Sequence, residues 1–156
     1  MDAPTAAHPA ARTALLLALR VAGAGLLVAM GWIHLYLWND GYRDISWIGP
    51  LFLGNVVGAF TLALAVLLTP TRWLAAASGL GALLQAGTLG ALVLTVQVGL
   101  FGFVESTRAE LFWQTVWVEA IGAVVLAVLA LLTVPRSRRA PGAARREAGV
   151  DRVDVR

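Results

Sequence analysis

The residue with the clearest chemical potential in this sequence is Glu119, a carboxylic acid inside a long apolar segment. Counting 1.5 Å per helical residue places Glu119 about 5 Å from the midpoint of that segment. An ionised carboxylate at such a depth in a membrane is costly unless it is neutralised, paired or hydrated. We therefore consider two roles. In the first role, Glu119 binds a ligand, a proton or a partner. In the second, it is protonated and links two helices by a hydrogen bond to Asn55 or to a backbone carbonyl.

His34 is the second ionisable candidate and lies about one helical turn inside the end of the first apolar segment. Its charge changes near neutral pH, so it could carry a proton or hydrogen-bond a quinone-like carbonyl. A solvated or headgroup-bound histidine is the structural alternative. Met30 lies four residues earlier on the same face, but the chain has no cysteine and only Met1 besides, and His8 lies in the N-terminal tail. We therefore predict no metal site and no cofactor.

Helical spacing groups the polar residues into three stripes of small and polar side chains, a pattern typical of bundle-facing surfaces in membranes. The stripes are Arg20, Gly23, Leu27, Met30, His34 and Trp38; Phe52, Asn55, Gly58 and Leu62; and Phe112, Thr115, Glu119, Gly122 and Leu126. If the stripes converge, His34, Asn55 and Glu119 line an outward-opening cavity capped by the loop Asn39–Ser46.

Tryptophan is concentrated at the same ends of the apolar segments. An aromatic belt at the headgroup level accounts for Trp38, Trp47 and Trp113. Trp32 and Trp117 lie more than a turn deeper, so a belt explains them less well. The predicted cavity or ligand-binding residues are Glu119, His34, Asn55, Trp32, Trp117 and Arg43.

Composition identifies the elements that must position these residues. The chain has 156 residues, of which 59% are hydrophobic and 13% are charged, whereas about a quarter charged is usual in globular proteins. Four apolar segments reach the roughly 20 residues that a membrane-spanning helix needs. The first is too long for a signal peptide. We predict an all-α bundle of four transmembrane helices at 13–38, 47–68, 73–100 and 109–134, between an N-terminal tail, 1–12, and a disordered Arg-rich tail, 135–156.

The distribution of arginine predicts the orientation of the bundle. All twelve basic residues are arginine, and ten of them fall on the side of the two termini. The positive-inside rule therefore predicts that both termini are cytoplasmic and that the protein is a multi-pass protein of the plasma membrane. The same rule explains the basic tail, which would attract anionic lipid, so the charge does not indicate nucleic-acid binding.

Other motifs add little chemistry. The absence of cysteine excludes disulfides and thiolate catalysis. The sequence contains no phosphate-binding glycine loop, zinc signature or nucleophile elbow, and no internal repeat supports an inverted-repeat transporter. Small residues at helical spacing allow close packing, either inside the bundle or against a membrane-protein partner or a second copy. The glycines concerned are Gly54, Gly58, Gly81 and Gly90.

The stretch "IHLYLWNDGYRDISWIGPLFLGN", from residue 33 to residue 55, resembles the first-loop region of small, largely uncharacterised four-helix membrane proteins of actinobacteria. The resemblance implies a fold and a lineage, not an activity. In general layout the chain is also similar to the DoxX-like family, some members of which are linked to quinone or thiol redox chemistry.

Three functions remain open. We favour a non-enzymatic accessory or interaction subunit with a polar cavity in the outer half of the bundle. A quinone-binding redox protein that uses His34 and Glu119 predicts an aromatic slot near Trp32, Phe52 and Trp117. A small proton-coupled carrier predicts a hydrated path through both halves of the bundle. The inner half offers few polar groups for such a path, namely Gln85, Thr61 and Thr88.

Overall fold

The computed structural model describes residues 9–134 and contains four α-helices and one 3-10 turn. The elements are α1 (Pro9–Asn39), η1 (Tyr42–Asp44), α2 (Ile48–Leu68), α3 (Thr71–Gln97) and α4 (Phe112–Thr133). The predicted all-α four-helix bundle is confirmed, and all four helices are long and apolar enough to cross a membrane. The chain is therefore a multi-pass membrane protein. The predicted disordered tail, 135–156, lies outside the described residues.

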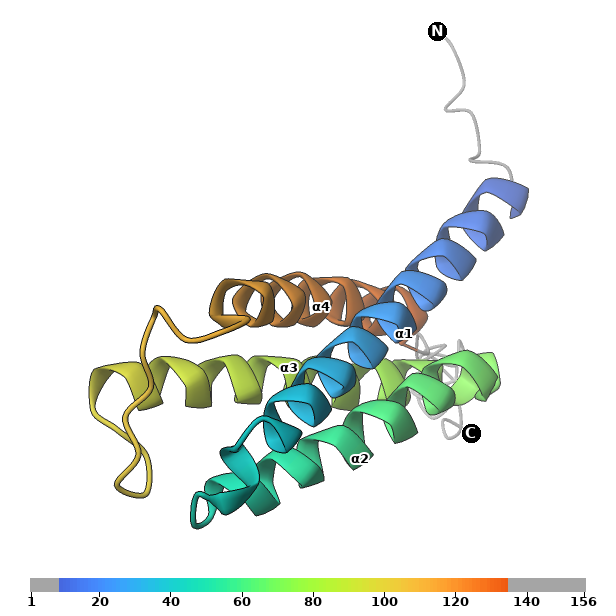
Figure 1. The fold of residues 1–156 in the computed structure, drawn as a ribbon. Coiled ribbons are helices and arrows are strands. Elements are labelled where there is room, and N and C mark those ends of the chain that lie inside the picture. The colour runs from blue at the N-terminus through green and yellow to red at the C-terminus, as the bar shows by residue number, and fades with distance from the viewer. Residues whose placement is uncertain (1–8, 135–156) are drawn as a thin grey trace, which may run out of the picture.

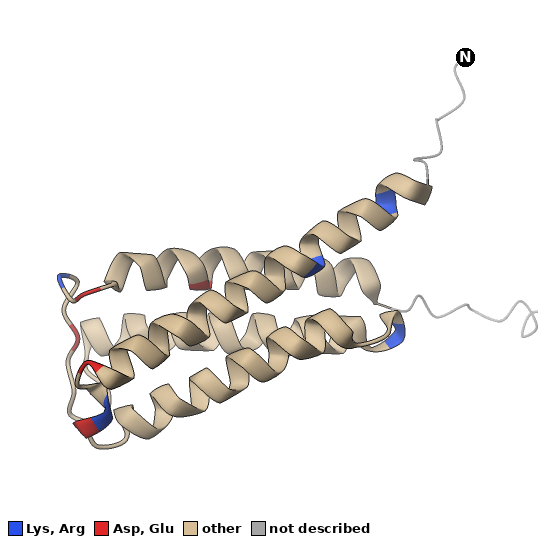
Figure 2. Cartoon of the chain, turned by 45° about the vertical axis from the view of Figure 1, so that its right-hand side comes forward, with Lys and Arg blue, Asp and Glu red and all other residues tan. Residues whose placement is uncertain are grey.

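The helices associate as two close pairs, α1 with α2 and α3 with α4, and α4 also packs on α1 (Figure 1). Contact between α2 and α3 is looser. We call the end with η1 and the connection 98–111 the pocket end, and the opposite end the termini end. The first turns of α1 project beyond the other helices at the termini end (Figures 1 and 2).

The close-packed core occupies the termini half of the bundle. Its side chains are aliphatic, and most are fully buried because small residues let the helices approach closely. The core consists of Ala24, Leu27, Met30, Ala59, Ala63, Val66, Leu74, Ala77, Leu126 and Leu129. The cluster itself is apolar, and the buried side chain of Ser78 lies next to Ala77 on α3. The termini half is therefore packed mainly by aliphatic side chains.

The helix boundaries follow local backbone geometry. α1 begins at Pro9, in the first helical position, where the missing N–H of proline costs nothing. α3 ends at Gln97, before the predicted residue 100, because Gly99 has a φ of 80°. α4 begins at Phe112 because Leu111 has a φ of 58°, in the left-handed region.

Two of the glycines predicted to support packing lie inside the bundle. A Cβ on Gly81 would lie 3.1 Å from Leu126, and one on Gly58 would lie 3.4 Å from Leu84. A Cβ on Gly54 or Gly90 would meet no heavy atom within 4 Å among the described residues. Contact with a partner or a second copy therefore stays a prediction, and the glycines open to it are Gly54 and Gly90.

Arg20 joins α1 to the end of α2 although it lies within a membrane-spanning helix. Its Nε donates to the carbonyl of Val66 at 2.5 Å, and a terminal nitrogen donates to the carbonyl of Thr69. These carbonyls belong to the last turn of α2, where helical backbone acceptors lack partners and a positive charge is favourable. The guanidinium thus supplies two donors that the helix itself cannot.

We expect Arg20→Met to lower the free energy of unfolding by about 1–3 kcal/mol, because two carbonyls lose their donors. Thermal unfolding in mild detergent would measure the loss as a lower Tm. Arg12→Met is the matched control, because Arg12 is exposed on the same helix. Equal Tm values for the two variants would contradict the capping role.

Candidate functional site

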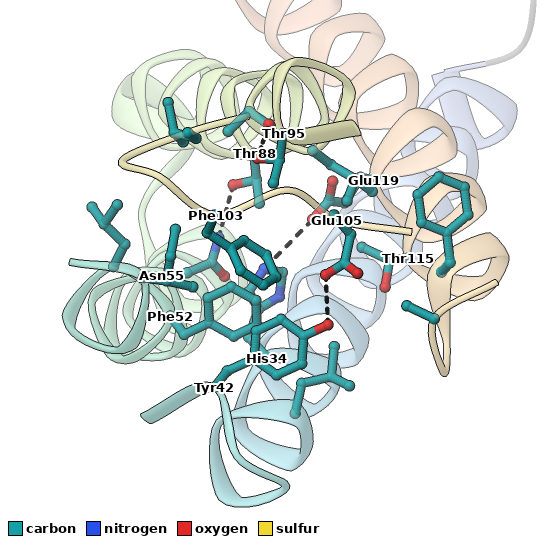
Figure 3. A pocket seen from close by; sticks show the side chains of 18 of the residues that line it. His34, Tyr42, Phe52, Asn55, Thr88, Thr95, Phe103, Glu105, Thr115 and Glu119 are labelled. Carbon is teal, nitrogen blue, oxygen red and sulfur yellow. Dashed lines mark hydrogen bonds and ion pairs between the residues drawn. The ribbon is translucent and has the colours of Figure 1, made fainter. Parts of the chain in front are cut away.

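A pocket of about 410 Å³ opens at the pocket end of the bundle, where α2 and α3 diverge and the connection 98–111 crosses between them (Figure 3). Every helix contributes to its wall, and so do η1 and the connection. Most of the lining is aliphatic or aromatic. The polar and titratable lining residues are His34, Tyr42, Asn55, Thr88, Thr95, Glu105, Glu110, Thr115 and Glu119.

His34 and Glu119 face each other at one side of this pocket. The distance from His34 Nε2 to Glu119 Oε1 is 3.8 Å, and both side chains are almost completely buried. The other ring nitrogen, Nδ1, lies 2.9 Å from the carbonyl of Met30. Since a carbonyl can only accept, Nδ1 carries the hydrogen and Nε2 is the atom presented to Glu119.

This geometry lets the pair hold one proton. If the proton is on Glu119, the carboxyl can donate to the lone pair of Nε2; if it is on His34, a cationic imidazole faces a carboxylate. The pair is neutral overall in both arrangements. A bare carboxylate at this depth would be far more costly, so the fold favours keeping one proton between the two side chains.

Three buried oxygen atoms beside the pocket have no hydrogen-bond partner among the described residues. They are Oε1 and Oε2 of Glu119 and Oδ1 of Asn55. Asn55 instead donates its amide to Thr88 Oγ1 at 2.7 Å, and Thr88 donates to the carbonyl of Leu84 at 2.8 Å. The alternative in which Glu119 links helices by hydrogen-bonding Asn55 or a backbone carbonyl is therefore wrong for this structure.

Gln85 braces the helix that carries Glu119. In the amide orientation that satisfies both its oxygen and its nitrogen, the Gln85 nitrogen donates to the backbone carbonyls of Val118 at 2.9 Å and Glu119 at 3.3 Å. Gly122 makes room for this contact, since a Cβ there would collide with the Gln85 amide. The brace fixes the rotation of α4 against α3 and so holds the Glu119 carboxyl toward the pocket.

Four ring side chains form a continuous wall. The ring of Phe52 lies 4.9 Å from that of His34 and stacks on Tyr42 at 4.8 Å, and Tyr42 meets the ring of Phe103 edge-on at 5.9 Å. The Tyr42 hydroxyl donates to Glu105 at 2.5 Å (Figure 3). This bond joins η1 to the connection 98–111 at the mouth of the pocket.

The structure brings together three of the six residues predicted from the sequence. His34, Asn55 and Glu119 line the pocket. Trp32 and Trp117 do not, and their side chains are 65% and 62% exposed. Each tryptophan precedes its pocket residue by two positions, which is about 200° around a helix, so it points to the opposite face.

Arg43, the sixth predicted residue, also lies away from the pocket lining. Its guanidinium is 3.7 Å from Asp44, and both side chains are largely exposed. Its backbone matters more than its charge, because the Arg43 carbonyl sits where a Cβ on Gly49 would be, only 2.5 Å away. Gly49 thereby lets η1 rest on the first turn of α2.

Sequence reasoning missed the residues supplied by the two connections. Tyr42, Phe103 and Glu105 come from segments predicted only as loops, and no helical period marks them. Thr88, which the sequence predicts in the inner half, lies beyond the midpoint of α3 toward the pocket end and accepts a hydrogen bond from Asn55. A midpoint count on the helix would have placed it correctly.

Comparison with known proteins gives no relative: no family model, no curated protein and no solved structure matches this chain.

Tyr42 offers a test of the contact at the pocket mouth that depends on pH. Burial, together with the hydrogen bond to Glu105, raises the pKa of Tyr42 above its ordinary value. A raised pKa in the folded state stabilises the fold fully below the unfolded pKa of about 10, and this stabilisation is lost as the pH rises through the folded pKa. We expect Tyr42→Phe to cost about 1–2 kcal/mol near neutral pH and less in strong alkali.

The measurement is Tm as a function of pH in detergent for the wild type and for Tyr42→Phe. Tyr36→Phe is the control, since its hydroxyl makes an exposed bond to Glu110. If the difference in Tm between the wild type and Tyr42→Phe stays constant into strong alkali, the hydrogen bond from Tyr42 to Glu105 is not the source of the stabilisation.

Proposed function

We propose that this protein is a non-enzymatic multi-pass protein of the plasma membrane that holds a small amphiphilic molecule in its pocket, as an accessory or interaction subunit. The observation that carries the proposal is the group of unpartnered buried oxygens of Glu119 and Asn55 beside an otherwise apolar pocket. Buried polar atoms normally have hydrogen-bond partners. These oxygens have no donor among the described residues, so a ligand that carries donors can bind them. The volume of about 410 Å³ falls within the range of small-molecule sites.

The closed termini half supports binding over transport. A carrier needs a hydrated path from one face to the other. Within residues 9–134 the core between Leu27 and Leu129 is aliphatic, and the buried hydroxyl of Ser78 beside it is not enough to line such a path. Thr88, one of the few polar residues assigned to that half, belongs to the pocket instead. The pocket is therefore open at one end of the bundle only, which supports a site that retains its ligand.

A quinone is the second candidate, and the ring wall with the His34–Glu119 pair favours it. A quinone carbonyl requires a donor from the protein. However, Tyr42 already donates to Glu105, and Asn55 already donates to Thr88. The proton held by the His34–Glu119 pair is then the donor left for a quinone carbonyl. Three oxygen acceptors, two on Glu119 and one on Asn55, are free instead, so the quinone is the weaker of the two proposals.

The charges support the same orientation that arginine predicts from the sequence. Figure 2 shows the acidic positions mainly at the pocket end and basic positions at both ends. Arg12 and Arg20 lie in the first half of α1 and Arg72 at the start of α3, toward the termini end, whereas Arg43 and Arg108 lie at the pocket end. Positive charge is retained on the cytoplasmic side of membrane proteins. We accordingly propose that the pocket opens toward the outside of the cell.

A pocket-blocking variant tests the proposed function. We expect native mass spectrometry of the protein from its own membranes to show a bound small molecule, and Ala91→Phe to lose it, because Ala91 lines the pocket. Ala76→Phe is the control, since Ala76 is exposed on the same helix in its termini half. A molecule retained equally by both variants, or none on the wild type, would contradict pocket binding.

The absence of cysteine makes the orientation directly testable. We expect a cysteine at exposed Thr107 to react with a membrane-impermeant maleimide in intact cells, because the proposed orientation puts the connection 98–111 outside. Thr71→Cys at the termini end should react only after the cells are opened. The reverse pattern would place the pocket in the cytoplasm.

A further inference from the structure

We propose that the pocket selects an organic cation that carries N–H donors, such as a protonated primary amine on an aromatic or short apolar group. This inference rests on the proposed function and names the ligand class. It follows from the sign of the lining charges, from which hydrogen-bonding atoms remain free, and from the ring wall.

The lining charges have one sign. Three carboxylates, those of Glu105, Glu110 and Glu119, line the pocket, and no arginine or lysine does so in the part of the chain that the structure describes. The rim carboxylates each accept a bond from a tyrosine hydroxyl. Glu119 accepts none and is fully buried, so the most deeply buried of the three acidic groups is the one whose oxygens have no hydrogen-bond donor among the described residues.

The free hydrogen-bonding atoms are acceptors. Both oxygens of Glu119 and Oδ1 of Asn55 lack donors, while the amide of Asn55 and the hydroxyls of Tyr42 and Thr88 are already donating. An ammonium group carries three N–H donors and no acceptor, which complements such a wall. A neutral carbonyl ligand would leave these oxygens unsatisfied, and that is costly for buried polar atoms.

The ring wall suits a cation as well as an apolar body. A cation within about 6 Å of a ring centroid is attracted to the ring face, and more strongly where water is excluded. Phe52 and Phe103 lie on the same wall as Tyr42 and line the same pocket as Glu119. The ligand's charge would then face Glu119, and its apolar part would lie among aliphatic and aromatic side chains.

Charge balance adds a condition on binding. The His34–Glu119 pair is neutral while it holds one proton, so a bound cation keeps the site neutral only if that proton leaves. The other ionisable groups lining the pocket are Glu105 and Glu110 from the connection and Tyr42 from η1; α2 and α3 contribute no ionisable lining residue. Cation and proton therefore compete for the same carboxylate.

The test is isothermal titration calorimetry of the full chain in lipid nanodiscs with three matched probes: benzylammonium, benzyl alcohol and benzyltrimethylammonium. We expect benzylammonium to bind most tightly, because it alone combines a positive charge with N–H donors. Glu119→Gln should weaken benzylammonium binding about tenfold or more, since hydrogen bonds to charged groups are the strong ones. Asp44→Asn, which removes an exposed carboxylate outside the pocket lining, should leave binding unchanged.

Fold is checked separately, because a variant that fails to fold would imitate loss of binding. Glu119→Gln must keep the Tm and the monodisperse elution of the wild type, and Ala91→Phe should abolish benzylammonium binding independently of charge. If benzyl alcohol binds as tightly as benzylammonium, is unaffected by Glu119→Gln and is lost in Ala91→Phe, the cation proposal fails while pocket binding stands. If no probe binds while mass spectrometry still finds a pocket-dependent molecule, the cation proposal again fails alone.

Discussion

The cost of placing a polar group where water cannot reach it governs this structure. Hydrogen bonds between helices meet that constraint for the amide nitrogen of Asn55, which donates to Thr88, and for Arg20, which donates to the end of α2. Glu119 does not: its carboxyl oxygens have no hydrogen-bond partner among residues 9–134, and the imidazole of His34 lies 3.8 Å away. The Gln85 brace holds the carboxyl in this position instead of relieving it. The bundle therefore maintains an unsatisfied acid beside an open space.

The same four helices pack closely in one half of the bundle and leave a pocket in the other half. In the termini half, small residues and aliphatic side chains bring the helices into close contact around Leu27 and Leu126. In the other half, α2 and α3 separate, and the connections fill the space only in part with Tyr42 and Phe103. A stable core at one end gives the rigidity that lets the other end remain hollow.

The fold was largely predictable from the sequence, because membrane-spanning length and hydropathy leave few alternatives to a helical bundle. Helical spacing placed His34, Asn55 and Glu119 on stripes that could face one another, but their convergence on one pocket is known only from the structure. The prediction was wrong for Trp32 and Trp117, because it considered their depth in the membrane and not their direction around the helix. Each is two positions from a pocket residue, which places its side chain on the opposite face. Tyr42, Phe103 and Glu105 could not be found, since positions in irregular connections depend on positive-φ turns such as those at Gly99 and Gly102.

The shared proton has a consequence for how the protein responds to membrane potential. Voltage acts on charge displaced through the field, and a full crossing is worth about 2.3 kcal/mol per elementary charge per 100 mV. A proton that moves over the 3.8 Å between Glu119 and His34 covers about an eighth of a 30 Å hydrocarbon layer. The electrical work is then at most about 0.3 kcal/mol per 100 mV. Transfer of the proton between Glu119 and His34 is thus nearly independent of the membrane potential.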